Sequence, residues 1–435
     1  MFSRVNRRPK SFPQVRYTIF MTLSEELAWR GLVNQTTYKD LAVLDGDKIT
    51  FYWGVDPSAD SMTIGNLAAA MMVKAFKRHG HKPVLLLGGA TGLIGDPDGK
   101  SQERGLKSPD EITKNKRAIL DQYHRLFGRH GLKIVDNYDW FKNMGYLEFL
   151  RDTGKNVPMR QLLARDFVQT RLGEGGAGIS YAEFSYVLIQ AYDFLELYQK
   201  HGVTLQVCGS DQWGNSIAGV DLIRRKTGGQ AHVYSVPLII NKATGDKFGK
   251  TEDGAIWLDP AKTTPTQFYQ FWINVDDQEV EDYLKVFTEL DKAAVDKLMA
   301  GQRQDPGQRQ AQMALAHEVT SLVHGIDAAE LAEAMTLFLI GRKSIGEADD
   351  FVLEAVRNGI PAIEIKPDSS VIEALVKSSL ASSNTEARRL LQANAISVNG
   401  QKINRENFQP ADFQTGRLLL RRGKAFKDSA LVELA

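Results

Sequence analysis

The stretch from Lys48 to Arg104 constrains the fold of this chain more than any other part of its sequence. It begins with Lys48 to Val55, a run dense in β-branched and aromatic residues that is typical of a buried strand. A turn and a helix-forming segment from Leu67 to His79 follow, and Gly80 stands where a helix commonly ends. A second apolar run, Val84 to Leu87, suits a parallel strand. Strand, helix and parallel strand form a βαβ unit, and such units bind ligands at the carboxyl ends of their strands.

The glycine-containing turns of this stretch allow several interpretations. Thr63 to Asn66 (T-I-G-N) resembles the signature turn of class I aminoacyl-tRNA synthetases, which places ATP phosphates at a helix N-terminus. Gly89 to Gly95 resembles the dinucleotide turn of NAD(P)-dependent epimerases and reductases, but Asp96-Pro97 follows at once and favours a loop over the required helix. Gly95 to Ser101 ends like a P-loop, yet Ile94 stands where that motif needs glycine. A turn that only packs two elements is the remaining interpretation.

Composition narrows the class of protein. A length of 435 residues indicates two or three domains with a sizeable core. Lys plus Arg number 54 and Asp plus Glu number 53, so any contact with nucleic acid must be local. Cys208 is the single cysteine, which excludes a disulfide within the chain and favours a reducing compartment. No apolar run approaches the length of a membrane span.

The first twenty residues differ from the rest. They are basic and carry no acidic residue. This composition fits an organellar transit peptide. It also fits an unstructured extension ahead of Met21, and we expect residues 1–20 to be a disordered extension.

A second informative stretch begins at Ser180. Ser180 and Glu183 have the spacing of a capping box, which predicts a helix that stops at Gly202. Tyr186, Gln190 and Asp193 are spaced four and three apart, so they share one face of this helix. By spacing alone, this polar stripe is equally a solvent face or the wall of a pocket.

The following segment repeats the layout of the first unit. The apolar run Val203 to Cys208 predicts a strand, Gly209 to Asn215 a turn, and Ile217 to Ile223 a helix. Val236 to Ile240 predicts a further strand. After it, K-F-G-K-T (247–251) places two lysines in a glycine-flanked loop, which suits a mobile clamp on phosphate charge.

Taken in order, these stretches resemble the bacterial-type tyrosyl-tRNA synthetases, a family of class I synthetases, from about Met21 to the C-terminus. The motifs that carry the resemblance are F-Y-W-G-V-D-P-S-A-D-S (51–61), G-G-A-T-G-L-I-G-D-P (88–97), F-S-Y-V-L-I-Q-A-Y-D-F (184–194), G-S-D-Q-W-G-N (209–215) and K-F-G-K-T (247–251). The resemblance implies a tyrosine–tRNA ligase. In that reaction the tyrosine carboxylate attacks the α-phosphorus of ATP, pyrophosphate leaves, and the acyl group passes to the 3′-terminal adenosine of tRNA.

The resemblance also implies roles for individual residues. Tyr52 and Asp193 would hold the phenolic hydroxyl of tyrosine, and the tyrosine-binding set is Tyr52, Gly54, Asp96, Tyr186, Gln190 and Asp193. The ATP- and adenylate-binding set is Asp56, Ser58, Gly65, Gly209, Asp211, Gln212 and Lys250. The catalytic set is Thr63, Asn66, Lys100, Arg104, Lys247, Lys250 and Thr251. The reacting carboxylate is already ionised, so these groups would act by positioning and by stabilising charge.

One motif departs from the family. The signature turn usually reads H-I-G-H, and here it reads Thr63-Ile64-Gly65-Asn66. Asn66 can still present an amide N–H, whereas Thr63 is short and cannot be cationic. We interpret the chain as an active enzyme with an altered phosphate contact. The alternative is a catalytically weakened paralogue that acts mainly as a structured-RNA-binding protein.

The expected fold class is α/β, with a Rossmann-like parallel-sheet catalytic domain first. We expect this domain at residues 21–259 with a connective insertion at about 121–178, an α-helical domain at 260–340, a linker at 341–369 and a small S4-like α+β RNA-binding domain at 370–435. In the last domain Asn399-Gly400 is a strong type I′ hairpin signal. Residues 366–435 hold eleven Lys/Arg and seven Asp/Glu, and the expected tRNA contacts are Arg388, Arg389, Arg417, Arg421, Arg422 and Lys424.

The expected partners are those of the family. They are tRNA(Tyr), L-tyrosine and ATP with Mg²⁺ as the substrate complex, with no permanently bound metal or organic cofactor. We expect a cytoplasmic homodimer that does not associate with a membrane.

Overall fold

The structure is a computed structural model that describes residues 21–97, 105–163, 165–240, 248–251, 254–423 and 428–435. The predicted extension 1–20 lies outside these residues. The chain forms two compact units: one combines the chain up to Asp259 with residues 278–306, and the other combines residues 260–277 with 307–435. The helices of the expected 260–340 domain are therefore divided between the two units.

The first unit is built on a six-stranded sheet in the order β1-β6-β5-β2-β3-β4. Five strands run parallel, and short β1 (Gln35–Thr36) pairs antiparallel with β6. The chain order reverses between β2 and β5, which is the switch point where α/β sheets bind ligands. The parallel strands are β2 (Thr50–Val55), β3 (Lys82–Leu87), β4 (Lys133–Asp136), β5 (Leu205–Gly209) and β6 (His232–Val236).

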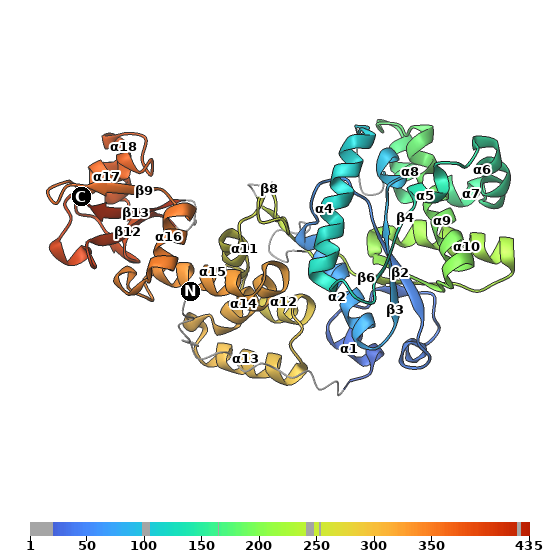
Figure 1. Cartoon of the computed structure of the whole chain (residues 1–435), viewed down its shortest axis with the longest axis horizontal. Coiled ribbons are helices and arrows are strands. Elements are labelled where there is room, and N and C mark those ends of the chain that lie inside the picture. Colours follow the sequence, from blue (N-terminus) through green and yellow to red (C-terminus); the bar gives the residue numbers. More distant parts are fainter. Residues whose placement is uncertain (1–20, 98–104, 164, 241–247, 252–253, 424–427) are drawn as a thin grey trace, which may run out of the picture. The chain divides into compact units, whose positions relative to one another are not determined.

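Helices cover both faces of this sheet (Figure 1). They are α2 (Ile64–Arg78) and α4 (Pro109–Phe127) on one face, with α9 (Tyr181–His201) and α10 (Trp213–Thr227) on the other. Alternation along β2 divides its side chains between the two faces. Phe51 packs on Phe76 of α2, with ring centroids 5.0 Å apart, whereas Tyr52 packs on Phe194 of α9 at 5.2 Å. A strand buried on both faces thus explains the continuous apolar run in the sequence.

Shorter elements complete the first unit. The insertion between β4 and α9 consists of α5 (Tyr138–Phe141), α6 (Tyr146–Asp152), α7 (Met159–Leu163) and α8 (Asp166–Leu172). The remaining elements are α1 (Leu23–Trp29), α3 (Thr91–Ile94), β7 (Lys250–Thr251), β8 (Gly254–Ala255), α12 (Val280–Phe287) and α13 (Lys292–Gln304).

The second unit joins helices to a five-stranded sheet in the order β11-β10-β12-β13-β9. Asn399 and Gly400 both have positive φ, at 48° and 81°, so the predicted hairpin turn is confirmed. The helices are α11 (Pro265–Ile273), α14 (Gln310–His324), α15 (Ile326–Leu339), α16 (Asp350–Gly359), α17 (Val371–Lys377) and α18 (Asn384–Gln392). The strands are β9 (Ala362–Ile365), β10 (Ile396–Val398), β11 (Gln401–Ile403), β12 (Arg417–Arg422) and β13 (Ser429–Leu434).

Three local features differ from the sequence-based expectations. The strand expected at Val236–Ile240 is His232–Val236, because its pairing with β5 begins earlier in the chain. The segment 341–369, expected as a linker, contains α16 and the edge strand β9. Only half of the expected capping box forms, since Ser180 accepts from the Glu183 amide while the Glu183 carboxylate pairs with buried Arg171 at 2.8 Å.

Candidate active site

A pocket of about 380 Å³ lies where β2 and β5 end. The strands end side by side at the switch point, so the loops after both contribute to its wall. The pocket is lined by every predicted tyrosine-binding residue, by every predicted ATP-binding residue except Lys250, and by Thr63 and Asn66. The structure therefore brings together residues from Tyr52 to Gln212 in one cavity. Lys100, Arg104 and Lys247, and the side chains of Lys250 and Thr251, lie outside what the structure describes.

One end of the pocket is formed by Tyr52 and Asp193. The Tyr52 hydroxyl is buried and has no hydrogen-bond partner in the described part of the chain, so it is available to a ligand. Asp193 is also buried, and burial raises the pKa of its carboxyl well above the ordinary value. Two donors oppose that shift: Asn137 Nδ2 lies 3.0 Å from Asp193 Oδ2, and Trp140 Nε1 lies 2.9 Å from Oδ1. Each oxygen of the Asp193 carboxyl therefore accepts one N–H hydrogen bond, and the side chain also lines the pocket.

A second group of polar side chains surrounds Tyr186. Its hydroxyl donates to Asp56 Oδ2 at 2.7 Å, and Thr91 Oγ1 donates to Asp56 Oδ1 at 2.6 Å. Burial raises the pKa of Tyr186 well above its ordinary value, and the charges of Asp56, Asp96 and Asp193 raise it further. The three carboxylates therefore give this part of the pocket a negative potential that suits an ammonium group.

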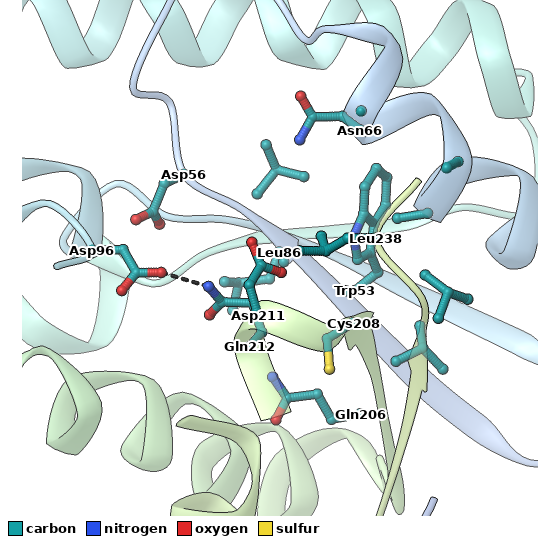
Figure 2. A pocket seen from close by; sticks show the side chains of 18 of the residues that line it. Trp53, Asp56, Asn66, Leu86, Asp96, Gln206, Cys208, Asp211, Gln212 and Leu238 are labelled. Atoms are coloured by element: carbon teal, nitrogen blue, oxygen red, sulfur yellow. Dashed lines mark hydrogen bonds between the residues drawn. The ribbon is translucent and has the colours of Figure 1, made fainter. Parts of the chain in front are cut away.

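The polar stripe of α9 belongs to the pocket and not to the solvent face. Tyr186 and Asp193 are buried, Gln190 is half-buried, and all three line the cavity. Among the described residues, the Gln190 Oε1 atom has no hydrogen-bond partner. In the same pocket, Gln212 Nε2 donates to Asp96 Oδ2 at 2.5 Å (Figure 2).

The N-terminus of α2 forms the other end of the pocket. Asn66 Oδ1 accepts from the backbone N–H of Thr63 at 3.0 Å and from its hydroxyl at 3.2 Å. This leaves Nδ2 as the donor end of the Asn66 side chain, as the sequence analysis expected. The amides of Ile64 and Asn66 donate to the carbonyls of Ile256 and Thr63, so exposed Gly65 is the position at the start of α2 that is suited to a phosphate oxygen.

Comparison with known proteins identifies the family. Residues 44–339 match the family described as tRNA synthetases class I (W and Y), and residues 352–427 match the tyrosine–tRNA ligase SYY-like C-terminal domain. Tyrosine–tRNA ligase 1 of Enterococcus faecalis is 42% identical over 416 residues, which is 93% of this chain and 98% of that protein. Tyrosine–tRNA ligase of Rhodopirellula baltica is 42% identical over 433 residues, or 96% of this chain and 98% of that protein.

The fold of this chain is also similar to that of a solved synthetase structure. It is a C-terminally truncated mitochondrial tyrosyl-tRNA synthetase from Aspergillus nidulans, with a TM-score of 0.65 and 32% identity over 72% of this chain and 93% of that one. The chain belongs to the tyrosine–tRNA ligase family. This family membership excludes the NAD-dependent and P-loop interpretations of the glycine-rich turns. In the structure, Gly95 ends the short helix α3, and the described residues after it, Asp96 and Pro97, are not helical, whereas a dinucleotide turn opens a helix at its last glycine.

Several polar residues of this pocket were not predicted from the sequence. Asn137 and Trp140 belong to the insertion, and Thr91, Gln206 and Cys208 also line or support the pocket. The available signal for Asn137 was its place directly after β4, at the carboxyl edge of the sheet. Cys208 is buried, and burial raises the pKa of its thiol to about 12, so the thiol is protonated at neutral pH.

The arginines of the family's C-terminal domain fall into two groups. Arg388 and Arg389 are exposed on α18, with Arg388 Nε 3.4 Å from Glu406 Oε1. Arg417, Arg421 and Arg422 are half-buried and donate to partners within the unit, namely Glu433, the Leu339 carbonyl and the Leu380 carbonyl. Lys424 lies outside the described residues.

Two structural findings concern cofactors and membranes. Within the described part of the chain, no group of three or more His, Cys, Asp or Glu side chains is placed to hold a metal ion. No described helix is long and apolar enough to cross a membrane.

Proposed function

We propose that this chain activates L-tyrosine with ATP in the pocket at the ends of β2 and β5, and then transfers tyrosine to tRNA(Tyr). A single observation carries the assignment of the site. The same pocket holds an unpartnered buried hydroxyl and a buried carboxylate at one end, Tyr52 and Asp193, and a helix N-terminus at the other. Tyrosine with a phenol at one end and ATP phosphates at the other matches this polarity.

The amino acid fits the first end. The phenolic hydroxyl would donate to the Asp193 carboxylate and accept from the Tyr52 hydroxyl, which satisfies both protein groups. The ammonium group would lie among Asp96, Gln190 and Tyr186, where the carboxylates make the potential negative. The tyrosine carboxylate would then face Asp211, Gln212 and the nucleotide.

The nucleotide fits the second end. The Asn66 amide and the α2 N-terminus would hold phosphate oxygens, and Asp56, Gly209 and Asp211 would line the ribose. The tyrosine carboxylate oxygen bonds to the α-phosphorus while the bond to the bridging oxygen breaks, so pyrophosphate leaves. Mg²⁺ enters with ATP as part of the substrate. The chain's own residues orient the reactants and stabilise charge, and Lys100, Arg104, Lys247, Lys250 and Thr251 remain predicted contributors.

The second step needs tRNA. A hydroxyl of the terminal adenosine attacks the adenylate carbonyl, the ester of tRNA forms and AMP leaves. The exposed guanidinium groups of Arg388 and Arg389 on α18 support a phosphate contact in the C-terminal unit. Arg417, Arg421 and Arg422 would contact tRNA only through groups that their internal partners leave available.

The test is pyrophosphate exchange into ATP, measured with tyrosine and without tRNA, followed by charging of tRNA(Tyr). We expect tyrosine-dependent exchange and charging. Binding of structured RNA without exchange would instead support the weakened-paralogue alternative, to which the 42% identical relatives lend no support. Exchange driven equally by phenylalanine would overturn the assignment of the Tyr52 end.

We also propose a cytoplasmic homodimer that uses the insertion as its interface. Of the large hydrophobic side chains exposed among the described residues, most belong to residues 138–181. Exposed apolar side chains concentrated in one segment favour an interaction surface there, and a two-fold dimer pairs one such surface with itself. The side chains concerned are Tyr138, Tyr146, Leu147, Met159, Leu163, Leu172 and Tyr181.

Two leucines of equal exposure allow a matched test of the interface. Leu147 in the insertion and Leu106 outside it are each 78% exposed. Light scattering after gel filtration should show a shift of Leu147→Asp toward monomer at low micromolar concentration, while Leu106→Asp should keep the mass of the unaltered protein. A dimer mass for both variants would place the interface elsewhere.

A further inference from the structure

A line of hydrogen-bonded side chains connects the insertion to the pocket. Arg165, the N-cap residue of α8, donates from Nη1 to Asn215 Oδ1 at 2.5 Å. Asn215 is 1% exposed, and its Nδ2 donates to Gln212 Oε1 at 3.1 Å. Gln212 Nε2 in turn donates to Asp96 Oδ2 at 2.5 Å, as Figure 2 shows. In each of the three hydrogen bonds, the donor is on the side of Arg165 and the acceptor is on the side of Asp96.

The direction of this line follows from the chemistry of its two ends. A guanidinium group has donors only, so Asn215 must present its carbonyl oxygen to Arg165. That leaves the Asn215 amide nitrogen for Gln212, and it leaves the Gln212 nitrogen for Asp96. An ionised carboxylate accepts only, so the Asp96 end demands the same orientation.

The backbone at the start of α10 is shaped for this contact. A Cβ atom at Gly214 would lie 3.2 Å from both Nε and Nη2 of Arg165, so the guanidinium lies close against the first turn of the helix. Asn215, the next residue, is buried and needs a donor for its carbonyl oxygen. Without Arg165, this oxygen loses a charge-assisted hydrogen bond, and the Asn215 amide is free to turn away from Gln212.

We infer that Arg165 is a positioning residue for the amino-acid end of the pocket, acting through Asn215 and Gln212 on the carboxylate of Asp96. The inference rests on the proposed function, in which Asp96 holds the ammonium group of tyrosine. It assigns to the insertion a role in substrate binding that is separate from its apolar surface. Arg165 itself lines no part of the pocket, so its effect reaches tyrosine only through the intervening amides.

The inference predicts a selective change in tyrosine binding. In pyrophosphate exchange, Arg165→Met should raise the KM for tyrosine about three- to tenfold, the effect of losing one hydrogen bond that orders a binding group. The KM for ATP should change less than twofold. Arg165→Lys, which keeps a donor, should recover at least half of the loss. Arg160→Met, an exposed arginine on α7, is the matched control and should behave like the unaltered protein.

A double-variant comparison separates positioning from general damage to the fold. If Arg165 acts through Asn215, the double variant Arg165→Met with Asn215→Ala should match Asn215→Ala alone within twofold. Asn215→Asp offers an isosteric variant, because its carboxylate still accepts from Arg165 but cannot donate to Gln212. Its KM for tyrosine should also rise.

The outcomes are distinguishable. An unchanged KM for tyrosine in Arg165→Met, an equal rise in the KM for ATP, or multiplied effects in the double variant would each overturn the inference. If Arg165→Met does not fold, an unchanged tyrosine KM in Asn215→Asp would overturn it. An unaltered protein without tyrosine-dependent exchange would instead overturn the proposed function itself.

Discussion

At the scale of single residues, the pocket combines one buried carboxylate with one buried hydroxyl and leaves both open toward a ligand. Burial raises the pKa of the Asp193 carboxyl well above its ordinary value, and the hydrogen bonds donated by Asn137 and Trp140 oppose that shift. The Tyr52 hydroxyl has no hydrogen-bond partner among the residues that the structure describes. A site that needs a substrate hydroxyl rejects the analogue without it, a principle for which tyrosyl-tRNA synthetases are themselves the standard example.

The first prediction concerns this selectivity. Tyr52→Phe should raise the activation of phenylalanine relative to tyrosine, because the altered pocket no longer leaves a buried hydroxyl unpaired when phenylalanine binds. Asp193→Ala should impair tyrosine activation more severely, since a hydrogen bond to a charged group is worth about 1.5–3 kcal/mol. The measurement is the ratio of kcat/KM for the two amino acids in pyrophosphate exchange. An unchanged ratio in Tyr52→Phe, with Asp193→Ala fully active, would place the pocket elsewhere.

At the scale of elements, buried polar contacts hold together helices that are distant from one another in the sequence. In the first unit, Glu26 on α1 pairs with Arg30 at 2.6 Å and with Arg78 at the end of α2, and His79 lies 2.7 Å away. Arg30 also donates to the carbonyls of Lys285, in the last turn of α12, and of Thr288, its C-cap residue. The Glu26 carboxylate and the Arg30 guanidinium together therefore hold three helices in contact.

The second prediction tests the network by pH. Burial alone would raise the pKa of Glu26, but the charges of Arg30 and Arg78 and the hydrogen bonds from His79 and Arg30 outweigh it and lower the pKa below the ordinary 4.5. A lowered carboxyl pKa stabilises the fold fully above about pH 4.5 and loses that contribution as pH falls through the folded pKa.

Glu26→Gln should therefore lower the melting temperature most at pH 7, where removing one partner of a buried pair costs about 3–5 kcal/mol. The difference from the unaltered protein should shrink toward pH 3. Exposed Glu174→Gln is the control and should melt like the unaltered protein throughout. A difference that is constant with pH would show that the charge of Glu26 does not stabilise the network.

In the second unit, two glycines let the hairpin turn touch the end of α15. A Cβ at Gly400 would lie 2.7 Å from the Cα and N of Gly341, and 2.7 Å from the Ile340 carbonyl oxygen. Nearby, the side chain of Ser344 donates to Gln414 at 2.7 Å. The contact is between backbones, so neither side can move aside like a flexible side chain.

The third prediction compares Gly400→Ala with Gly416→Ala. Both glycines have φ near +80°, but a Cβ at Gly416 meets nothing within 4 Å. Gly416→Ala should lower the free energy of unfolding only by the strain of an alanine in the left-handed conformation, about 1–2 kcal/mol. Gly400→Ala should lower the free energy of unfolding by a larger amount, because the added Cβ atom also separates the hairpin turn from the end of α15. Equal losses of melting temperature in the two variants would mean that the close contact contributes nothing.

At the scale of the whole molecule, the division into units does not follow the chain in order. Residues 278–306 belong to the unit with the pocket, and a hydrophobic cluster within the other unit joins helices α15 and α16 to strands β12 and β13. Leu419 and Leu431 of these strands pack with Leu353 and Val356 of α16. The five-stranded sheet therefore shares its core with the helices that precede it.

The fourth prediction concerns truncation. Removing residues 344–435 should leave tyrosine-dependent pyrophosphate exchange near the full-length rate and greatly reduce charging of tRNA(Tyr), because the pocket lies wholly in the first unit. Removing only residues 366–435 should likewise preserve pyrophosphate exchange and reduce charging. This shorter deletion should also cause more aggregation, because it keeps α16 but uncovers Leu353, Val356 and Ile360. Charging at the full-length rate by either protein would refute the role of the C-terminal domain.

The sequence by itself determined the βαβ units, the helix of the polar stripe and the hairpin, and its resemblance to the family implied many of the residues that line the pocket. These features follow from local periodicity, turn chemistry and ordered motifs, which neighbouring residues carry. Only the tertiary structure decided that the stripe of Tyr186 and Asp193 faces a cavity, and that Asn137 and Trp140 donate hydrogen bonds to Asp193. It also decided that the Glu183 carboxylate pairs with Arg171 and does not complete the cap of its own helix. Each of these contacts depends on which strands and helices become neighbours in space. A side chain with several possible partners is directed by the packing of distant segments, which local sequence patterns do not contain.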